Sequence, residues 1–180
     1  MISFSFGRNW KRFVRHVVND EILQCAQDSL RNFLGNDLGF EDKVFLDIGC
    51  GSGLFSLAAL RLGACHIISI DIDKHSIEAT QMLQEKFYYL IPQEICWEVL
   101  EGNILDKDFV DSLCAKLQEI GKDIVLYSWG VLHHTGNLSL AMNHVMRLAS
   151  YKYTVDDGGG HIIFILLYTT RLKQVHGGIM

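Results

Sequence analysis

The chain has 180 residues, a length that fits one domain with a single core, and its content of 49% hydrophobic and 21% charged residues is typical of a globular protein. Its formal net charge of -5 argues against nucleic-acid binding, because phosphate recognition needs clustered lysine and arginine. The 5 cysteines form no CxxC pair, which excludes a disulfide framework or a zinc knuckle and favours a reducing compartment.

The sequence shows no targeting or membrane signal. The N-terminal stretch MISFSFGRNWKRF has no long apolar run after its charges, so we expect no signal peptide. The longest apolar run, residues 162–167, is far shorter than the about 20 residues that a membrane-spanning helix needs. We therefore expect a cytoplasmic protein without a membrane partner.

Three segments are expected along the chain. Residues 1–19 form a basic and aromatic N-terminal segment, residues 20–168 the folded domain, and residues 169–180 a short tail. The basic residues of the first segment are best interpreted as the solvated face of a short helix. Its aromatic residues either pack in the core, which is the more common role, or close over a ligand. They are Phe6, Trp10 and Phe13.

Helix-like and strand-like patterns alternate from about residue 20 onward. Asp20 is a good N-cap for the first helix, whose C-terminal turn Gly35 can supply. Asp73 and Asn137 can cap later helices, and Pro92 prevents the continuation of one of them. In chain order, the predicted elements are a helix over residues 20–34, a strand over 43–48, a helix over 54–62, a strand over 66–70, a helix over 74–90, a strand over 96–100, a helix over 106–120, a strand over 123–128, a helix from 138 to 148 and a strand over 161–168.

Apolar strands that alternate with amphipathic helices predict a parallel sheet covered on both faces. Right-handed crossovers then give an α/β fold with a Rossmann-like, doubly wound and mainly parallel sheet of about five recognisable strands. In such a sheet, ligands bind outside the carboxyl ends of the strands.

A glycine-rich turn, FLDIGCGSG over residues 45–53, follows the first predicted strand. Gly49, Gly51 and Gly53 lack side chains, so the backbone can adopt positive φ angles and approach a ligand closely. The start of the next helix adds backbone N–H groups. Many tight strand-to-helix turns carry such glycines, so the turn alone does not identify the ligand.

Two details distinguish among nucleotide ligands. A dinucleotide fingerprint has the pattern G-x-G-x-x-G, but the sixth position counted from Gly49 is Leu54, and the glycine comes one residue early. Asp47 precedes the turn, where it would repel a pyrophosphate but suits a ligand with a cationic amino-acid portion. No G-K-[ST] follows, which excludes an ATP P-loop. These details favour S-adenosylmethionine, which carries an ammonium and a sulfonium group.

The motifs together resemble those of the class I S-adenosylmethionine-dependent methyltransferases, and the resemblance covers about residues 20–168. Residues 45–53 resemble the first motif of that family. The resemblance implies that the methionine portion of the cofactor is held by Asp47, Gly49, Cys50, Gly51 and Gly53.

The next motifs imply contacts with the nucleoside. Asp71 resembles the family's ribose-binding acid and follows the first glycine by about 20 residues, the spacing expected for that role. Ile72 offers an apolar face to the adenine. Residues 101–106 resemble the adenine-reading segment G-D-[AI]-x-D, here with Asn103 and Ile104. The asparagine carbonyl can still accept a hydrogen bond from the adenine amino group, although a simple turn is an alternative interpretation of this segment.

Residues 123–135 resemble the fourth motif of the small-molecule methyltransferases, including the quinone-biosynthesis type. The resemblance implies that Ser128 borders the cofactor and that His133 lines the acceptor pocket. Trp129 either lines that pocket or fills the end of the sheet. His133 is a candidate general base, with a structural histidine as the alternative. Neighbouring positions on a helical turn diverge by about 100°, so we expect His133 and His134 to face different surroundings. Neither has zinc-ligand spacing to a second cluster, and we predict no metal.

The sequence thus predicts a methyltransferase that transfers a methyl group in line to an unidentified small molecule. A non-catalytic or truncated cofactor-binding module and an NAD-dependent oxidoreductase are the alternatives. The family's sheet usually has seven strands, but the 12 residues after 168 are too few for the last two. The last predicted strand would then lie at an open edge, which favours a homodimer or a poorly soluble monomer.

Overall fold

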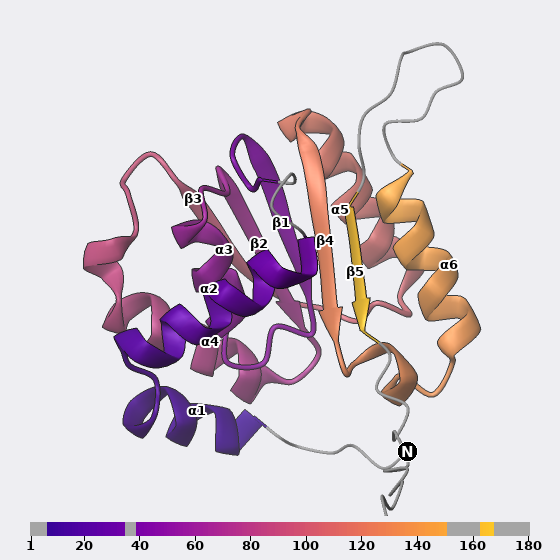
Figure 1. The fold of residues 1–180 in the computed structure, drawn as a ribbon. Coiled ribbons are helices and arrows are strands. Elements are labelled where there is room, and N and C mark those ends of the chain that lie inside the picture. The colour runs from indigo at the N-terminus through magenta and orange to yellow at the C-terminus, as the bar shows by residue number, and fades with distance from the viewer. Residues whose placement is uncertain (1–6, 35–38, 151–162, 168–180) are drawn as a thin grey trace, which may run out of the picture.

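The structure is a computed structural model that describes residues 7–34, 39–150 and 163–167 (Figure 1). Several sequence-based predictions fall outside these residues and are not addressed by the structure. They concern Phe6, Gly35, both ends of the last predicted strand and residues 169–180.

The described strands form one five-stranded sheet in the order β3-β2-β1-β4-β5, and every pairing is parallel. This confirms the predicted doubly wound α/β fold. The chain order reverses between β1 and β4, so the loops that follow these two strands diverge at the carboxyl edge of the sheet. The strands are β1 (Lys43–Ile48), β2 (His66–Asp71), β3 (Cys96–Glu101), β4 (Asp123–Trp129) and β5 (Ile163–Leu167).

Helices cover both faces of the sheet, and Figure 1 views it from the side of α2, α3 and α4. Alternate residues of β1 divide between the two layers, as the period of a strand requires. Phe45 packs with α2, α3 and α4, whereas Val44 and Leu46 pack with α5 and α6. The helices are α1 (Gly7–His16), α2 (Asp20–Leu34), α3 (Leu54–Arg61), α4 (Lys74–Lys86), α5 (Lys107–Ile120) and α6 (Leu138–Ala149), with short 3₁₀ turns at Tyr88–Leu90 and Leu132–His134.

The N-cap of α2 and the C-terminal end of α4 differ from the predictions. The N-cap of α2 is Asn19, whose side-chain oxygen accepts from the backbone N–H of Ile22 at 2.9 Å, and Asp20 is instead the first helical residue. Helix α4 ends at Lys86 rather than at residue 90. Phe87 leaves the helical conformation and its ring is buried in the core, so packing overrides the helical pattern there.

Helix α1 confirms the predicted short N-terminal helix and lies against α4. The Lys86 ammonium donates to the backbone oxygens of Val14 and Val18, at 2.8 and 2.6 Å, and so satisfies carbonyls at the C-terminal end of α1. At its other end, the N–H of Gly7 donates to the carboxylate of Asp73. Both ends of α1 are therefore held by α4.

Within the part of the chain that the structure describes, no helix is long and apolar enough to cross a membrane.

Candidate functional site

The glycine-rich turn after β1 lies at the carboxyl edge of the sheet, and its three glycines are all needed by its geometry. Gly49, Gly51 and Gly53 have φ angles of 83°, 57° and 75°, a region that other residues rarely adopt. A Cβ atom on Gly49 would lie 2.3 Å from a methyl carbon of Val131, and one on Gly53 would lie 2.6 Å from the methyl carbon of Thr80. Side chains at these positions are therefore excluded both by φ and by space.

Hydrogen bonds to β2 and α4 hold this turn. The backbone N–H groups of Gly49 and Cys50 both donate to the oxygen of Ile70, at 2.8 and 2.9 Å. The Thr80 hydroxyl donates to the oxygen of Gly51 at 3.3 Å and lies 3.3 Å from the Cys50 sulfur. The Cys50 side chain is thus buried beneath the turn, where it packs against α4.

Asp71, the last residue of β2, connects the turn to the next loop. One of its carboxylate oxygens accepts from the N–H of Gly51 at 3.0 Å and the other from the N–H of Asp73 at 2.9 Å. Burial raises the pKa of Asp71, although these two donors oppose the rise. The Ser76 hydroxyl also hydrogen-bonds this carboxylate, which leaves one of its roughly four acceptor sites for a further donor. The neighbouring Ile72 side chain is 65% exposed.

Asp47 lies deeper than the turn that it precedes. It is 2% exposed, and its carboxylate accepts from the Ser56 hydroxyl at 2.6 Å. Ser56 is also 2.7 Å from the Ser69 hydroxyl, which accepts from the indole N–H of Trp97 at 2.9 Å. Burial raises the pKa of Asp47 to about 7; the Ser56 hydrogen bond lowers it and the charge of Asp71 raises it further. The partner that this buried carboxylate requires is therefore provided within the fold.

Residues 102–106, which follow β3, form a turn. A turn was one of the two interpretations of their sequence. The side-chain oxygen of Asn103 accepts from the N–H of Leu105 at 2.9 Å. Ile104 is buried in the core, and its backbone oxygen lies 2.7 Å from Nδ1 of the buried His144 on α6. The N–H of Gly102 donates to the backbone oxygen of Asp71 at 2.9 Å, so this turn is attached to the end of β2.

The end of β4 borders the turn on its other side. The buried Ser128 hydroxyl donates to the backbone oxygen of Ile48 at 3.0 Å, across the point where the strand order reverses. Trp129 is 43% exposed, and its ring stacks on that of Phe55 with centroids 6.5 Å apart. An exposed aromatic surface therefore lies next to the carboxyl edge of the sheet.

The prediction that His133 and His134 face different surroundings agrees with their exposure, since His133 is half-buried and His134 is exposed. Both lie in the 3₁₀ turn Leu132–His134, and their ring centroids are 3.8 Å apart. Burial, with a smaller contribution from His134, lowers the pKa of His133. The neutral imidazole, which can accept a proton, is thereby favoured.

Sequence reasoning missed several residues that shape this site. Ser56 and Thr80 are polar residues on the buried faces of α3 and α4, a pattern that suggests a buried hydrogen bond but does not identify its partner. Val131 was not singled out. Trp10 was predicted to pack in the core or to close over a ligand. Its half-buried indole packs against the core and also lies close to Gly51. The two interpretations of Trp10, core residue and cover of the turn, are thus compatible.

Comparison with known proteins agrees with these motifs. Residues 32–106 match the family model described as Ribosomal protein L11 methyltransferase (PrmA). A ribosomal protein L11 methyltransferase of Photorhabdus laumondii is 39% identical over 133 residues, which are 67% of this chain and 42% of that protein. The enzyme of the same name from Aliivibrio salmonicida is 30% identical over 122 residues, 63% of this chain and 40% of that protein.

The chain belongs to the class I S-adenosylmethionine-dependent methyltransferases. It spans less than half the length of these two curated relatives.

Solved structures share the methyltransferase fold. A Methanococcus maripaludis protein described as an S-adenosyl-L-methionine-dependent methyltransferase has a TM-score of 0.55 at 17% identity, covering 82% of this chain and 61% of its own. The magnesium protoporphyrin IX methyltransferase of Synechocystis, crystallised with bound SAM, has a TM-score of 0.52 at 21% identity, covering 80% of this chain and 66% of its own. At these identities the likeness establishes the fold.

The raised pKa of Asp47 predicts a pH-dependent stability for this protein. Below the pKa of the unfolded state the carboxyl group is protonated in both states and contributes nothing. As pH rises from about 4 to about 7 the native state binds the proton more tightly than the unfolded state, so stability is lost. The free energy of unfolding of the wild type should therefore fall by a few kcal/mol over this range, since one pKa unit corresponds to about 1.4 kcal/mol. Asp47→Asn should not show this fall.

Urea unfolding of the wild type and of Asp47→Asn between pH 4.5 and 8 measures this difference. Asp28→Asn on the surface of α2 is the control, because its carboxylate is exposed. Wild-type and Asp47→Asn curves that stay parallel over this range would show that Asp47 titrates normally.

Proposed function

We propose that this chain binds S-adenosylmethionine at the carboxyl ends of β1, β2 and β3 and transfers its methyl group to an acceptor beside the end of β4. The observation that carries the proposal is the position of Asp71, which accepts from the backbone N–H groups of Gly51 and Asp73. The glycine turn lacks the dinucleotide spacing. Asp71, to which it is hydrogen-bonded, follows the first glycine by the number of residues expected for a ribose-binding carboxylate.

Each part of the cofactor has a matching group in this arrangement. A ribose hydroxyl would donate to the Asp71 carboxylate, which also accepts from Gly51, Asp73 and Ser76. The adenine would lie between the exposed Ile72 and the turn that contains Asn103 and Ile104. The methionine portion would lie along the backbone of Gly49, Cys50, Gly51 and Gly53. Its ammonium would be attracted by the negative charges of Asp71 and Asp47, the latter acting from beneath the turn.

The acceptor that we favour is a protein of the ribosomal protein L11 type, because that is the acceptor in the names of the curated relatives. The resemblance of residues 123–135 to small-molecule enzymes supports the second candidate, a small molecule bound against Trp129. In either case methyl transfer is an in-line displacement, for which positioning provides most of the rate. Ser128, which ties β4 to β1, fixes the strand end that would position the acceptor.

The same site can bind a cofactor without turning it over. A non-catalytic module would bind S-adenosylmethionine and its product S-adenosylhomocysteine but transfer no methyl group. An NAD-dependent oxidoreductase is disfavoured by Leu54 at the third-glycine position and by Asp47 beneath the turn.

The predicted homo-oligomer remains a prediction. β5 ends the described sheet, and size-exclusion chromatography showing a clean monomer would contradict the prediction.

Asp71→Asn should weaken S-adenosylmethionine binding by about tenfold or more, because a hydrogen bond to a charged group contributes about 1.5–3 kcal/mol. The amide keeps one oxygen that can accept from the backbone but replaces the other with a donor. Isothermal titration calorimetry measures the change, and Asp108→Asn on the exposed start of α5 is the matched control. An unchanged dissociation constant would show that Asp71 does not bind the cofactor.

Acceptor specificity is tested by following S-adenosylhomocysteine release with ribosomal protein L11 and with a panel of small phenols, amines and thiols. We expect S-adenosylhomocysteine to be released when this chain, S-adenosylmethionine and L11 are all present, since L11 is the acceptor that the relatives' names specify. Release with a small molecule alone would favour the second candidate. Tight cofactor binding without release in any mixture would support the non-catalytic module.

His133→Gln should lower kcat by about 100-fold, the lower end of what a general base contributes, and leave the dissociation constant of the cofactor unchanged. The control is His16→Gln, at the exposed end of α1. A fall in kcat that disappears at higher pH would fit the loss of a base that deprotonates the acceptor. An unchanged kcat would assign His133 a structural role.

A further inference from the structure

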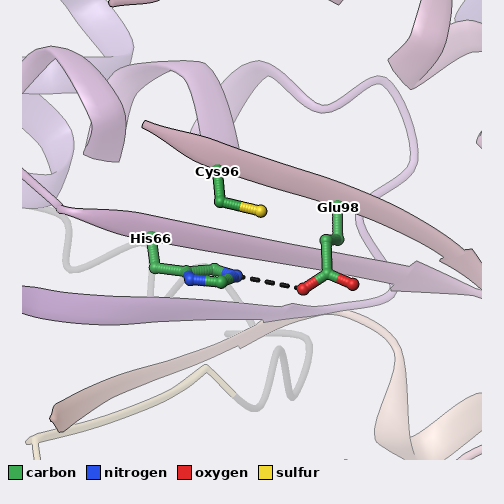
Figure 2. A group of neighbouring side chains, drawn as sticks. All are labelled: His66, Cys96 and Glu98. Carbon is green, nitrogen blue, oxygen red and sulfur yellow. Dashed lines mark hydrogen bonds and ion pairs between the residues drawn. The ribbon is translucent and has the colours of Figure 1, made fainter. Parts of the chain in front are cut away.

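Three metal-binding side chains meet at the end of the sheet opposite the proposed cofactor site. His66 and Cys96 are the first residues of β2 and β3, and the parallel register pairs them directly. Glu98 follows Cys96 by two positions, so it lies on the same face of β3. Figure 2 shows the three side chains on this face, with His66 and Glu98 joined by a dashed line. Asp71 is five residues along β2, roughly 17 Å away at the rise of a strand.

The side-chain atoms are close enough for one ion. Nε2 of His66 lies 3.0 Å from a carboxylate oxygen of Glu98, and one ligand atom from each residue lies within 4.8 Å of the others. Ligand atoms around a tetrahedral zinc ion, bonded at about 2.0–2.3 Å, lie roughly 3.3–3.8 Å apart. Small rotations of the Cys96 and Glu98 side chains would close the difference, while the paired strands hold the Cα positions.

We propose that His66, Cys96 and Glu98 bind a divalent transition-metal ion of the zinc type, with water as the fourth ligand. Imidazole nitrogen, thiolate sulfur and carboxylate oxygen are the three donor types that zinc takes from proteins. The thiolate and the carboxylate together balance the charge of the ion. This site is separate from the proposed methyl-transfer site and does not depend on it.

Lys116 of α5 is the cation that such an ion would displace. Its ammonium donates to the second carboxylate oxygen of Glu98 at 2.6 Å, and its side chain is 36% exposed, so it can turn toward solvent. A bridge between the sheet and α5 through His66, Glu98 and Lys116 would be a purely structural explanation of the cluster. That bridge makes no use of Cys96, so the role of the cysteine distinguishes the two explanations.

The prediction of no metal rested on ligand spacing along the sequence. Here the ligands come from two strands that are about 30 residues apart, and strand pairing brings them together. Sequence spacing cannot show such a site.

Titration of the full chain with Co²⁺, followed by its absorption spectrum, tests the proposal. We expect one equivalent to produce a thiolate-to-cobalt charge-transfer band in the near ultraviolet, which Zn²⁺ abolishes by displacement. Cys96→Ser and His66→Gln should each weaken Zn²⁺ binding at least about tenfold, whereas Cys25→Ser, an exposed cysteine on α2, should leave the band unchanged. No band in the wild type, or a band that persists in Cys96→Ser, would overturn the proposal.

Lys116→Met provides an independent test of the third ligand. Removing the competing ammonium should tighten Zn²⁺ binding severalfold, measured by displacement of Co²⁺. Zn²⁺ should also raise the midpoint of thermal unfolding in the wild type and not in Cys96→Ser, because a ligand stabilises the state that binds it. Unchanged or weaker Zn²⁺ binding in Lys116→Met would overturn the assignment of Glu98 as a ligand.

Discussion

The paired hydrogen bonds of the Asp71 carboxylate determine how the carboxyl edge of the sheet is built. One oxygen holds the N–H of Gly51 in the glycine turn, and the other holds the N–H of Asp73 at the start of α4. Asp73 in turn caps α4 and accepts from Gly7 of α1. The glycine turn, the end of β2 and two helices are therefore linked through two carboxylates, those of Asp71 and Asp73.

Burial makes this edge sensitive to charge. The pKa of Asp47 is raised to about 7 and that of Asp71 is also raised, in both cases chiefly because burial penalises the ionised form. Without a cation, the two negative charges destabilise one another. The ammonium of S-adenosylmethionine would relieve this repulsion, whereas a pyrophosphate would increase it. Electrostatics and the glycine spacing thus favour the same ligand, and the family relationship agrees with both.

Much of the fold could be predicted from sequence because β1, β2 and β4 are short, apolar and largely buried. The boundaries of β1 at residues 43–48 agree with the prediction for this reason. Asn19 as the cap of α2 was missed because Asp20 is an equally good capping residue by type. The Ser56 partner of Asp47 and the His66–Cys96–Glu98 cluster depend on how helices and strands pack, which the sequence pattern does not contain.

Calorimetric titration of the same protein with S-adenosylmethionine and, separately, with NAD tests the central claim most directly. The charges of Asp47 and Asp71 and the early glycine at position 53 predict that S-adenosylmethionine binds with one-to-one stoichiometry and that NAD does not compete. Tight NAD binding without S-adenosylmethionine binding would contradict the account.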